Sequence, residues 1–257
     1  SRRQRQMCIR DRVKSILVSQ PKPQNESSPY YELEKNNKIK IDFRPFIQVE
    51  GVDAKDVRHQ KIDFNRITAV IFTSRNAIDH FFRLAEDLRY TVPDTMKYFC
   101  ESEAIAFYLQ KYIVYRKRKV FTGGKTFADL VPLLKKHKDE KFLLPCSDVM
   151  KDEIPNTLNN LKIDWQKGIL FRTVSSNLSD LEDVKYDILV FFTPSGIKSL
   201  FDNFPDFKQE NTRIAAFGKS TVDMAKELGL RIDIEVPTKE TPSMTMALEK
   251  YVKEVNK

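Results

Sequence analysis

The sequence predicts an α/β protein built from parallel β-sheets with helices on both faces. Short runs rich in Val, Ile and Phe are continuously apolar, which is typical of strands buried on both faces. Amphipathic helical segments fill the gaps between these runs, and strand–helix alternation of this kind is the α/β pattern. The same pattern also occurs twice along the chain, which predicts two related units.

The expected elements follow from apolar runs and helical periodicity. The strands are expected at residues 15–20, 40–46, 69–74, 97–100, 119–122, 141–146, 167–174, 187–193, 213–218 and 231–236. The helices are expected at residues 76–88, 103–112, 126–134, 151–161, 195–203, 220–228 and 242–255.

The internal repeat is visible in the letters themselves. Residues 69–82 read AVIFTSRNAIDHFF, and residues 188–201 read ILVFFTPSGIKSLF. The segments that follow also match in order, with 97–109 (KYFCESEAIAFYL) parallel to 213–225 (RIAAFGKSTVDMA). Each repeat is a buried strand, a Phe-Thr or Phe-Phe-Thr end with small residues, and a helix.

The second repeat starts too late in the chain to contain its own opening strands. We therefore expect the N-terminal strands to join the C-terminal half in a discontinuous first domain, residues 13–44 plus 174–257. Residues 45–173 form the second domain. Two chain crossings make a hinge, and a hinge between domains makes a cleft in which a ligand can bind.

Residues 1–12 (SRRQRQMCIRDR) lack periodicity and the apolar core of a secretory signal, and we expect them to be a non-native or disordered tail. They hold five Arg and one Asp, so excluding them lowers the formal net charge from +8 to +4. The excess positive charge, on which an argument for nucleic-acid binding would depend, is therefore halved. No window approaches the ~20 apolar residues of a membrane span, and scattered Cys without metal spacing indicate reduced thiols. We expect a cytoplasmic protein without nucleic-acid or membrane partners.

Several common sites are excluded by the motifs that the sequence lacks. No G-x-G-x-x-G follows a strand, no nucleophile elbow is present, and no His/Asp/Glu cluster has metal-ligand spacing. We therefore expect neither a metal site nor a dinucleotide-binding fold. Residues 123–126 (GGKT) resemble the end of a P-loop, but Lys119 stands where its first Gly would be, which favours a polar turn with Thr126 as N-cap.

Hydroxyl side chains follow the strands at the points where helices begin. They are Thr73, Ser74, Thr193, Ser195, Ser220 and Thr221, the last two after Gly218. Ser and Thr are favourable N-caps, so each can serve as a cap alone. Helix N-termini also attract anions, and ligands of open α/β sheets bind at the carboxyl ends of strands. The sequence leaves both roles open for each residue.

Five segments in this order resemble the uroporphyrinogen-III synthase family: FTSRNAIDHF, LPCSD, LFRTVSS, FFTPSGIKSLF and IAAFGKSTVDMAKELG. The resemblance covers residues 13–255 and is greatest to the versions found in Bacteroidetes. It implies two flavodoxin-like domains joined by a two-stranded linker. It also implies a cofactor-free lyase of haem and other tetrapyrrole biosynthesis that acts on hydroxymethylbilane. A monomer is expected, with hydroxymethylbilane synthase as a transient partner.

The family's reaction explains why the sequence shows so little catalytic machinery. Ring A loses its hydroxyl as water, ring D attacks to give a spiro intermediate, and reclosure leaves ring D inverted in uroporphyrinogen III. The substrate carries many carboxylates, and without an enzyme it closes to the type I isomer. The resemblance therefore implies an interdomain cleft that works by positioning and electrostatics rather than by covalent catalysis.

The resemblance also assigns the site residues. Thr73 and Ser74 belong to one wall of the cleft, and Thr193, Ser195, Ser220 and Thr221 belong to the other. Gly218 is expected to let the backbone approach the substrate closely. In the first repeat the matching turn contains Glu101, which opposes carboxylate binding if it faces the cleft, so Ser102 is the expected contact, with helix capping as its alternative role.

One departure from the family concerns the proton donor. Many members carry a Tyr, proposed to protonate the leaving hydroxyl, at the position of Phe171. Arg172, Thr173, bound water or the substrate's own carboxyl groups remain as alternatives, so the catalytic residue is unknown. Phe171 also favours a second hypothesis, a non-catalytic two-domain protein that binds an anion or tetrapyrrole, or a regulatory protein with a degenerate synthase fold.

Overall fold

The computed structural model describes residues 12–150, 152–182 and 184–257. The expectation for the N-terminal tail concerns residues 1–12, of which 1–11 lie outside the described residues. The chain forms two compact units. The first contains the described residues up to Gln48 together with Val174–Lys257, and the second is Val49–Thr173. The first boundary thus lies four residues beyond the expected end at residue 44.

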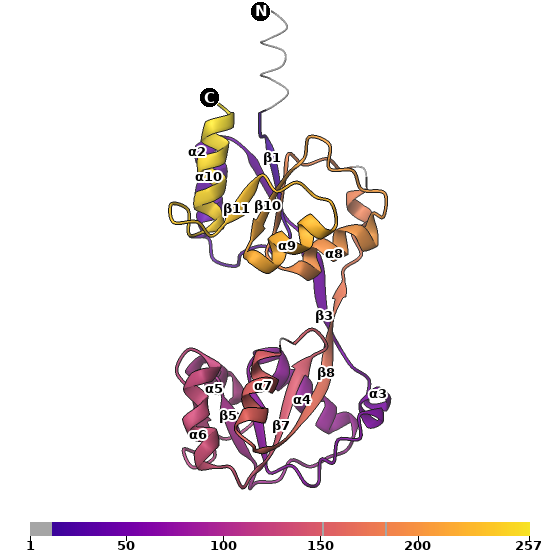
Figure 1. The fold of residues 1–257 in the computed structure, drawn as a ribbon, viewed down its shortest axis with the longest axis vertical. Coiled ribbons are helices and arrows are strands. Elements are labelled where there is room, and N and C mark those ends of the chain that lie inside the picture. The colour runs from indigo at the N-terminus through magenta and orange to yellow at the C-terminus, as the bar shows by residue number, and fades with distance from the viewer. Residues whose placement is uncertain (1–11, 151, 183) are drawn as a thin grey trace, which may run out of the picture. The chain divides into compact units, whose positions relative to one another are not determined.

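The first unit contains a parallel five-stranded sheet in the order β11-β10-β9-β1-β2 (Figure 1). Its strands are β1 (Ser15–Val18), β2 (Lys40–Phe43), β9 (Ile188–Phe191), β10 (Arg213–Phe217) and β11 (Ile234–Val236). Strand β1 pairs with β9, so that Ile16 lies opposite Ile188. The N-terminal strands therefore form one sheet with the C-terminal third of the chain.

Asp187 reinforces the pairing of β1 and β9 at their amino ends. Its carboxylate accepts hydrogen bonds from the main-chain N–H groups of Lys14 (2.8 Å) and Ser15 (2.9 Å). Hydrogen bonds to charged groups are stronger than neutral ones. Two segments far apart in the sequence are thus joined by one side chain as well as by the strand ladder.

Helices cover both faces of the first sheet. Helices α2 (Pro29–Asn37) and α10 (Met244–Val255) pack on one face, and α8 (Pro194–Asn203) and α9 (Lys219–Glu227) pack on the other. Successive strand residues point to opposite faces. Ile16 accordingly belongs to the core under α2 and α10, whereas Leu17 belongs to the core under α8 and α9.

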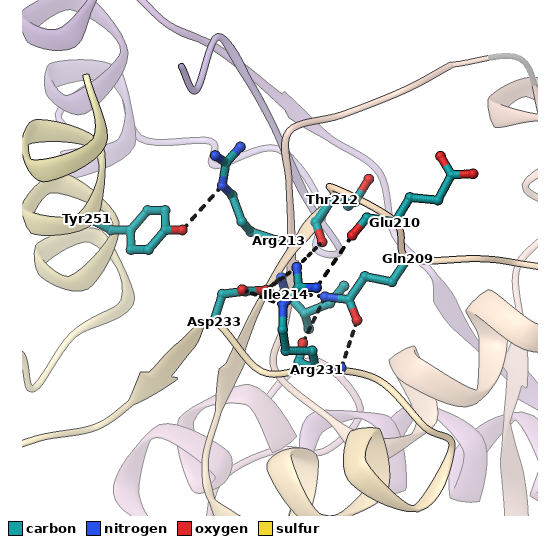
Figure 2. Close-up of polar contacts among 8 residues, drawn as sticks. All are labelled: Gln209, Glu210, Thr212, Arg213, Ile214, Arg231, Asp233 and Tyr251. Atoms are coloured by element: carbon teal, nitrogen blue, oxygen red, sulfur yellow. Dashed lines mark hydrogen bonds and ion pairs between the residues drawn. The ribbon is translucent and has the colours of Figure 1, made fainter. Parts of the chain in front are cut away.

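A polar network holds the amino ends of β10 and β11 (Figure 2). The Asp233 carboxylate accepts hydrogen bonds from the N–H of Ile214 (3.0 Å), from Nε2 of Gln209 (3.2 Å) and from Nε of Arg231 (2.8 Å). The Asp233 side chain is only 15% exposed, and these donors compensate its desolvation. The network fixes the loop before β10 and the entry into β11.

The second unit contains a six-stranded sheet in the order β3-β8-β7-β4-β5-β6. The strands are β3 (Ile47–Gly51), β4 (Ala69–Phe72), β5 (Lys97–Cys100), β6 (Val120–Thr122), β7 (Lys141–Ser147) and β8 (Asp164–Ser175). The pairs from β8 to β6 are parallel. Strands β3 and β8 both extend across the boundary between the units.

Helices also cover both faces of the second sheet. One core contains residues of α3 (Ala54–His59), α4 (Arg75–Asp87) and α5 (Glu103–Leu109). The other contains residues of the 3₁₀ helix η1 (Phe127–Leu130), α6 (Val131–Lys136) and α7 (Glu153–Asn160). Phe72 of β4 points into the first core and Ile71 into the second, so the continuous apolar run AVIF is buried on both faces.

The two sheets have the same spatial strand order, but the chain enters them at different points. Strands β2-β1-β9-β10-β11 of the first unit correspond to β8-β7-β4-β5-β6 of the second. The first order is the flavodoxin-like 2-1-3-4-5 arrangement. In the second unit the strands that match β1 and β2 come last in the chain. The second unit is inserted in the chain between β2 and β9, so the opening strands of the first unit lie at the N-terminus, far before the second sequence repeat.

The structure corrects several expected elements. The expected strand at 40–46 ends at Phe43, and a separate strand β3 begins at Ile47. Helices α2 and α3 were not expected, because each buries a single residue, Leu33 or Val57, and so has almost no apolar period. The expected helix at 126–134 is the 3₁₀ helix η1 followed by α6.

Candidate functional site

The carboxyl ends of parallel strands meet at one edge of each sheet, and ligands of open α/β folds bind where the strand order reverses. In the first unit this switch point lies between β1 and β9, because the chain goes from β1 to β2 on one side and from β9 to β10 on the other. The equivalent point in the second unit lies between β7 and β4. The candidate site is therefore described at these two edges, one in each unit.

Two hydroxyl groups converge at the switch point of the first unit. Thr193 caps α8, and its Oγ1 accepts a hydrogen bond from the N–H of Gly196 (3.1 Å). A β-carbon added to Gly196 would lie 3.4 Å from Thr193 Oγ1 and 3.8 Å from Ser19 Oγ. Ser19 follows β1 and is 9% exposed, whereas Thr193 is exposed. Ser195 lies half-buried in the first turn of α8.

The next strand end, after β10, places its groups differently from the expectation. Gly218 is the N-cap of α9 and has φ of 83°, a conformation that favours glycine. Nothing lies within 4 Å of a β-carbon built there, so the space beside it is open. Lys219 and Ser220 are exposed, but Thr221 is only 1% exposed. Ser220 therefore presents the accessible hydroxyl of this turn, and Thr221 packs inside it.

At the switch point of the second unit, Ser74 is an N-cap. Its Oγ accepts a hydrogen bond from the N–H of Ala77 (3.1 Å) at the start of α4. A serine hydroxyl that accepts one such bond keeps its own O–H for a second partner. Capping and carboxylate binding are thus compatible for Ser74, as they are for Thr193. Thr73 is half-buried, and the exposed Arg75 has its guanidinium 5.3 Å from the ring centroid of Tyr108.

The end of β5 lies directly beside the end of β4, because the N–H of Glu101 donates to the carbonyl of Phe72 (3.0 Å). Burial raises the pKa of Glu101, and the neighbouring Glu153 raises it further, while a hydrogen bond from the Phe127 N–H acts in the opposite direction. Ser102 is the N-cap of α5, and its side chain makes no capping bond.

The GGKT turn is closed by its own carboxylate. Asp129 accepts hydrogen bonds from the N–H groups of Lys125 (2.8 Å) and Thr126 (2.9 Å) and from the Thr126 hydroxyl (3.1 Å). These bonds lower the pKa of Asp129. An acidic side chain thus occupies the N–H groups that would cradle a phosphate in a P-loop, which agrees with the expected polar turn.

Phe171 lies in β8 next to a β-bulge. Cys146 of β7 pairs with Ile169, but the next residue, Ser147, pairs with Phe171, so Leu170 is the extra residue. Phe171 is 6% exposed, and its ring stacks on the imidazole of His80. Burial lowers the pKa of His80, and the nearby Arg83 lowers it further. The position at which the resemblance implies a Tyr is therefore a packed site in the core of the second unit.

The other two candidate proton donors lie on the same strand. Arg172 is exposed and faces Asp56 across 3.9 Å, a distance typical of weak surface ion pairs. The N–H of Thr173 donates to Oδ1 of Asp148 (3.1 Å), which also accepts a bond from the Ser147 hydroxyl (2.9 Å). Neither contact singles out Arg172 or Thr173 as an acid.

Sequence reasoning missed four residues at these strand ends: Ser19, Arg75, Ser147 and Lys219. Ser19 directly follows the central strand β1 of the first sheet, and Ser147 is the last residue of the central strand β7 of the second. The sequence did contain a signal for Ser19 and Ser147. Ligands of open α/β sheets bind at the carboxyl ends of strands, and this applies to β1 and β7 as it does to β4 and β9. Arg75 and Lys219 are the first residues of α4 and α9, where a cation adds to the positive end of the helix dipole.

Among residues 12–150, 152–182 and 184–257, no group of three or more His, Cys, Asp or Glu side chains is arranged to hold a metal ion. Over the same residues, no helix is both long and apolar enough to cross a membrane. Cys100 and Cys146 are free and buried, and burial raises their pKa values to about 12 and about 11.

Fold and site define a protein of two doubly wound α/β units with one strand order, whose strand ends carry hydroxyl groups and helix N-termini suited to anions. A family model described as uroporphyrinogen-III synthase HemD matches residues 31–246. The chain belongs to the uroporphyrinogen-III synthase family, and it is an enzyme of this kind, a cyclising lyase.

Individual relatives agree with this assignment. A uroporphyrinogen-III synthase of Chlorobaculum parvum is 24% identical over 94% of this chain and all of its own length. The crystal structure of uroporphyrinogen-III synthetase from Helicobacter pylori has a TM-score of 0.58 at 19% identity, covering 94% of this chain and 100% of that one. A mutant Thermus thermophilus uroporphyrinogen III synthase has a TM-score of 0.52 at 14% identity, with the same coverage. Both structures have the fold seen here.

Proposed function

We propose that this protein converts hydroxymethylbilane into uroporphyrinogen III and water, with inversion of ring D through a spiro intermediate. The family match over residues 31–246 carries this proposal. The reaction needs no redox partner: one hydroxyl leaves with one proton as water, and one carbon–carbon bond closes the ring. We propose further that residues of both units hold one substrate molecule during closure.

The strand ends of each unit supply the carboxylate contacts. In the first unit we assign these to Thr193, Ser195, Ser220 and the open backbone at Gly218. In the second unit we assign them to Thr73, Ser74 and Ser102. The hydroxyls of Thr193 and Ser74 retain an O–H to donate while they cap their helices. A single contact at a helix start contributes roughly 0.3–1 kcal/mol, so selectivity for the bent conformation comes from several contacts acting together.

Cationic side chains add to these hydroxyls. Arg75 and Lys219 are exposed at the first positions of α4 and α9. In this proposal each pairs with one substrate carboxylate, and Thr221, which is buried, keeps the turn in shape rather than touching the substrate. The enzyme then works by orienting the rings and by balancing charge as the ring A cation forms.

No side chain of the described residues is assigned as the proton donor. Phe171 has no proton to give and lies in a packed core. We assign the proton that leaves with the hydroxyl to water or to a carboxyl group of the substrate itself. Once the protein holds hydroxymethylbilane in the conformation that closes, the carboxyl groups of the substrate have fixed positions. An acidic side chain of the protein is then unnecessary as a proton donor.

The test is an isomer analysis. Hydroxymethylbilane is generated in situ, the protein is added, and the oxidised products are separated into uroporphyrin I and III. We expect mostly type III. Only type I in the presence of folded protein would refute the proposal and favour the alternative, a non-catalytic protein that binds an anion or a tetrapyrrole.

A further inference from the structure

A pocket in the second unit lies at the opposite edge of the sheet from the strand-end site. Its volume is about 660 Å³, which is within the range of small-molecule sites, roughly 300–1,000 Å³. It is lined by the second half of α4, by the loop between α4 and β5, by Tyr98 of β5 and by the segment between α5 and β6. These are the amino ends of β5 and β6, whereas the candidate catalytic groups follow carboxyl ends.

The lining combines flat apolar groups with a buried phenol. Phe82 and Tyr112 stack with ring centroids 4.6 Å apart and planes within 3° of parallel, and Ile113 and Met96 extend this surface. The hydroxyl of Tyr90 is buried, and among the described residues it has no hydrogen-bond partner. A buried hydroxyl without a partner is costly, so this group is available to a ligand that brings an acceptor.

Three cations complete the lining: Arg89, Arg116 and Lys119. Within the part of the chain that the structure describes, these three side chains make no ion pair with an acidic group. The pocket also contains the acids Glu86 and Asp94, so the cations exceed the acids by one. Charge complementarity therefore favours a ligand with an anionic group over a neutral or cationic one.

We propose that this pocket is a second small-molecule site that takes an organic anion with a flat apolar body, an aromatic carboxylate or phosphate ester. The anionic group contacts Arg116 and Lys119, the ring lies against Phe82 and Tyr112, and the Tyr90 hydroxyl donates a hydrogen bond to the ligand. The site is independent of the synthase reaction, because no lining residue belongs to the strand-end site.

The experiment is an NMR titration of the ¹⁵N-labelled full chain with phenyl phosphate. We expect saturable amide shifts within residues 89–98 and 112–119. Arg116→Ala and Tyr90→Phe should each weaken binding about five- to tenfold, as the loss of one hydrogen bond or charge contact predicts. Lys117→Ala is the matched control, because Lys117 lies in the same basic run but does not line the pocket. It should leave the affinity unchanged.

Three outcomes would overturn the proposal. Shifts that map to the strand ends near residues 73–75 or 219–221 would place the anion in the other site. If Lys117→Ala and Arg116→Ala weakened the affinity for phenyl phosphate equally, binding would be due to general surface charge and not to this pocket. Equal affinity for inorganic phosphate and phenyl phosphate would remove the role of the apolar surface. Thermal melts of each variant check the fold, and Tyr90→Phe should melt at or above the wild-type temperature, because it removes a buried hydroxyl that has no partner.

Discussion

The ring of Phe171 stacks on the imidazole of His80, with centroids 5.2 Å apart and planes 19° from parallel. The stack joins β8 to α4 inside the core of the second unit, immediately after the β-bulge at Leu170. At this position, where the family resemblance implies a Tyr, the Phe side chain contributes packing.

The first prediction concerns Phe171→Tyr. A new hydroxyl at a position that is 6% exposed needs a partner or is left unsatisfied. We expect the free energy of unfolding to fall by about 1–3 kcal/mol, with no gain in kcat. Urea denaturation and the isomer assay measure the two effects. A rise in kcat at unchanged stability would instead show that a hydroxyl at this position reaches the reacting groups.

The second prediction concerns pH. Burial lowers the pKa of His80 and of His137, helped by Arg83 and Lys97 respectively. The unfolded chain therefore binds more protons than the folded one below the usual histidine pKa of 6.5. Stability should be constant above this pH and should fall as the pH decreases below it. His80→Gln should flatten the slope in urea titrations between pH 5 and 7, and an unchanged slope would remove His80 from this pH dependence.

The third prediction compares two glycines that both have a positive φ. Gly218 and Gly229 have φ of 83° and 77°, and neither has an atom within 4 Å of an added β-carbon. Each Gly→Ala variant should lose roughly 1–3 kcal/mol of stability, because residues with a β-carbon rarely adopt these positive φ values. Only Gly218→Ala should also lower the fraction of type III product, because Gly218 borders the proposed site. Equal product ratios in both variants would remove Gly218 from the site.

The fourth prediction separates capping from substrate contact. Ser74→Ala removes an N-cap and should cost about 1 kcal/mol of stability in addition to raising KM. Ser220 is exposed and is not the cap of α9, so Ser220→Ala should raise KM several-fold at an unchanged melting temperature. A Ser220→Ala enzyme with wild-type KM would contradict a contact between this hydroxyl and the substrate.

The fifth prediction concerns the discontinuous unit. Asp187→Ala removes the acceptor for the N–H groups of Lys14 and Ser15 and should cost about 1.5–3 kcal/mol. Asp180→Ala is the control, because Asp180 makes an exposed ion pair with Arg44 that contributes at most about 1 kcal/mol. The midpoints of urea unfolding measure both. Equal losses would mean that the β1–β9 ladder alone joins the two segments.

The sequence by itself determined the fold class and most central strands, because runs such as AVIF are buried on both faces and carry a strong local signal. It also determined that the first and last parts of the chain share a sheet, because the second repeat starts too late in the chain to contain its own opening strands. It could not predict α2 or α3, whose single buried residues leave no periodic pattern. The role of each hydroxyl was equally undetermined, because capping and ligand binding require the same residue types.

Tertiary structure decided the properties that depend on neighbours distant in sequence. Thr221 and Ser220 are adjacent and chemically alike, yet packing buries the first and leaves the second exposed. Phe171 of β8 is buried in the core, where it follows a β-bulge and stacks on His80 of α4. The pocket beside Tyr90 exists only because two loops meet at the same sheet edge. Burial is a property of the assembled surroundings, and local sequence encodes only a residue's preference for it.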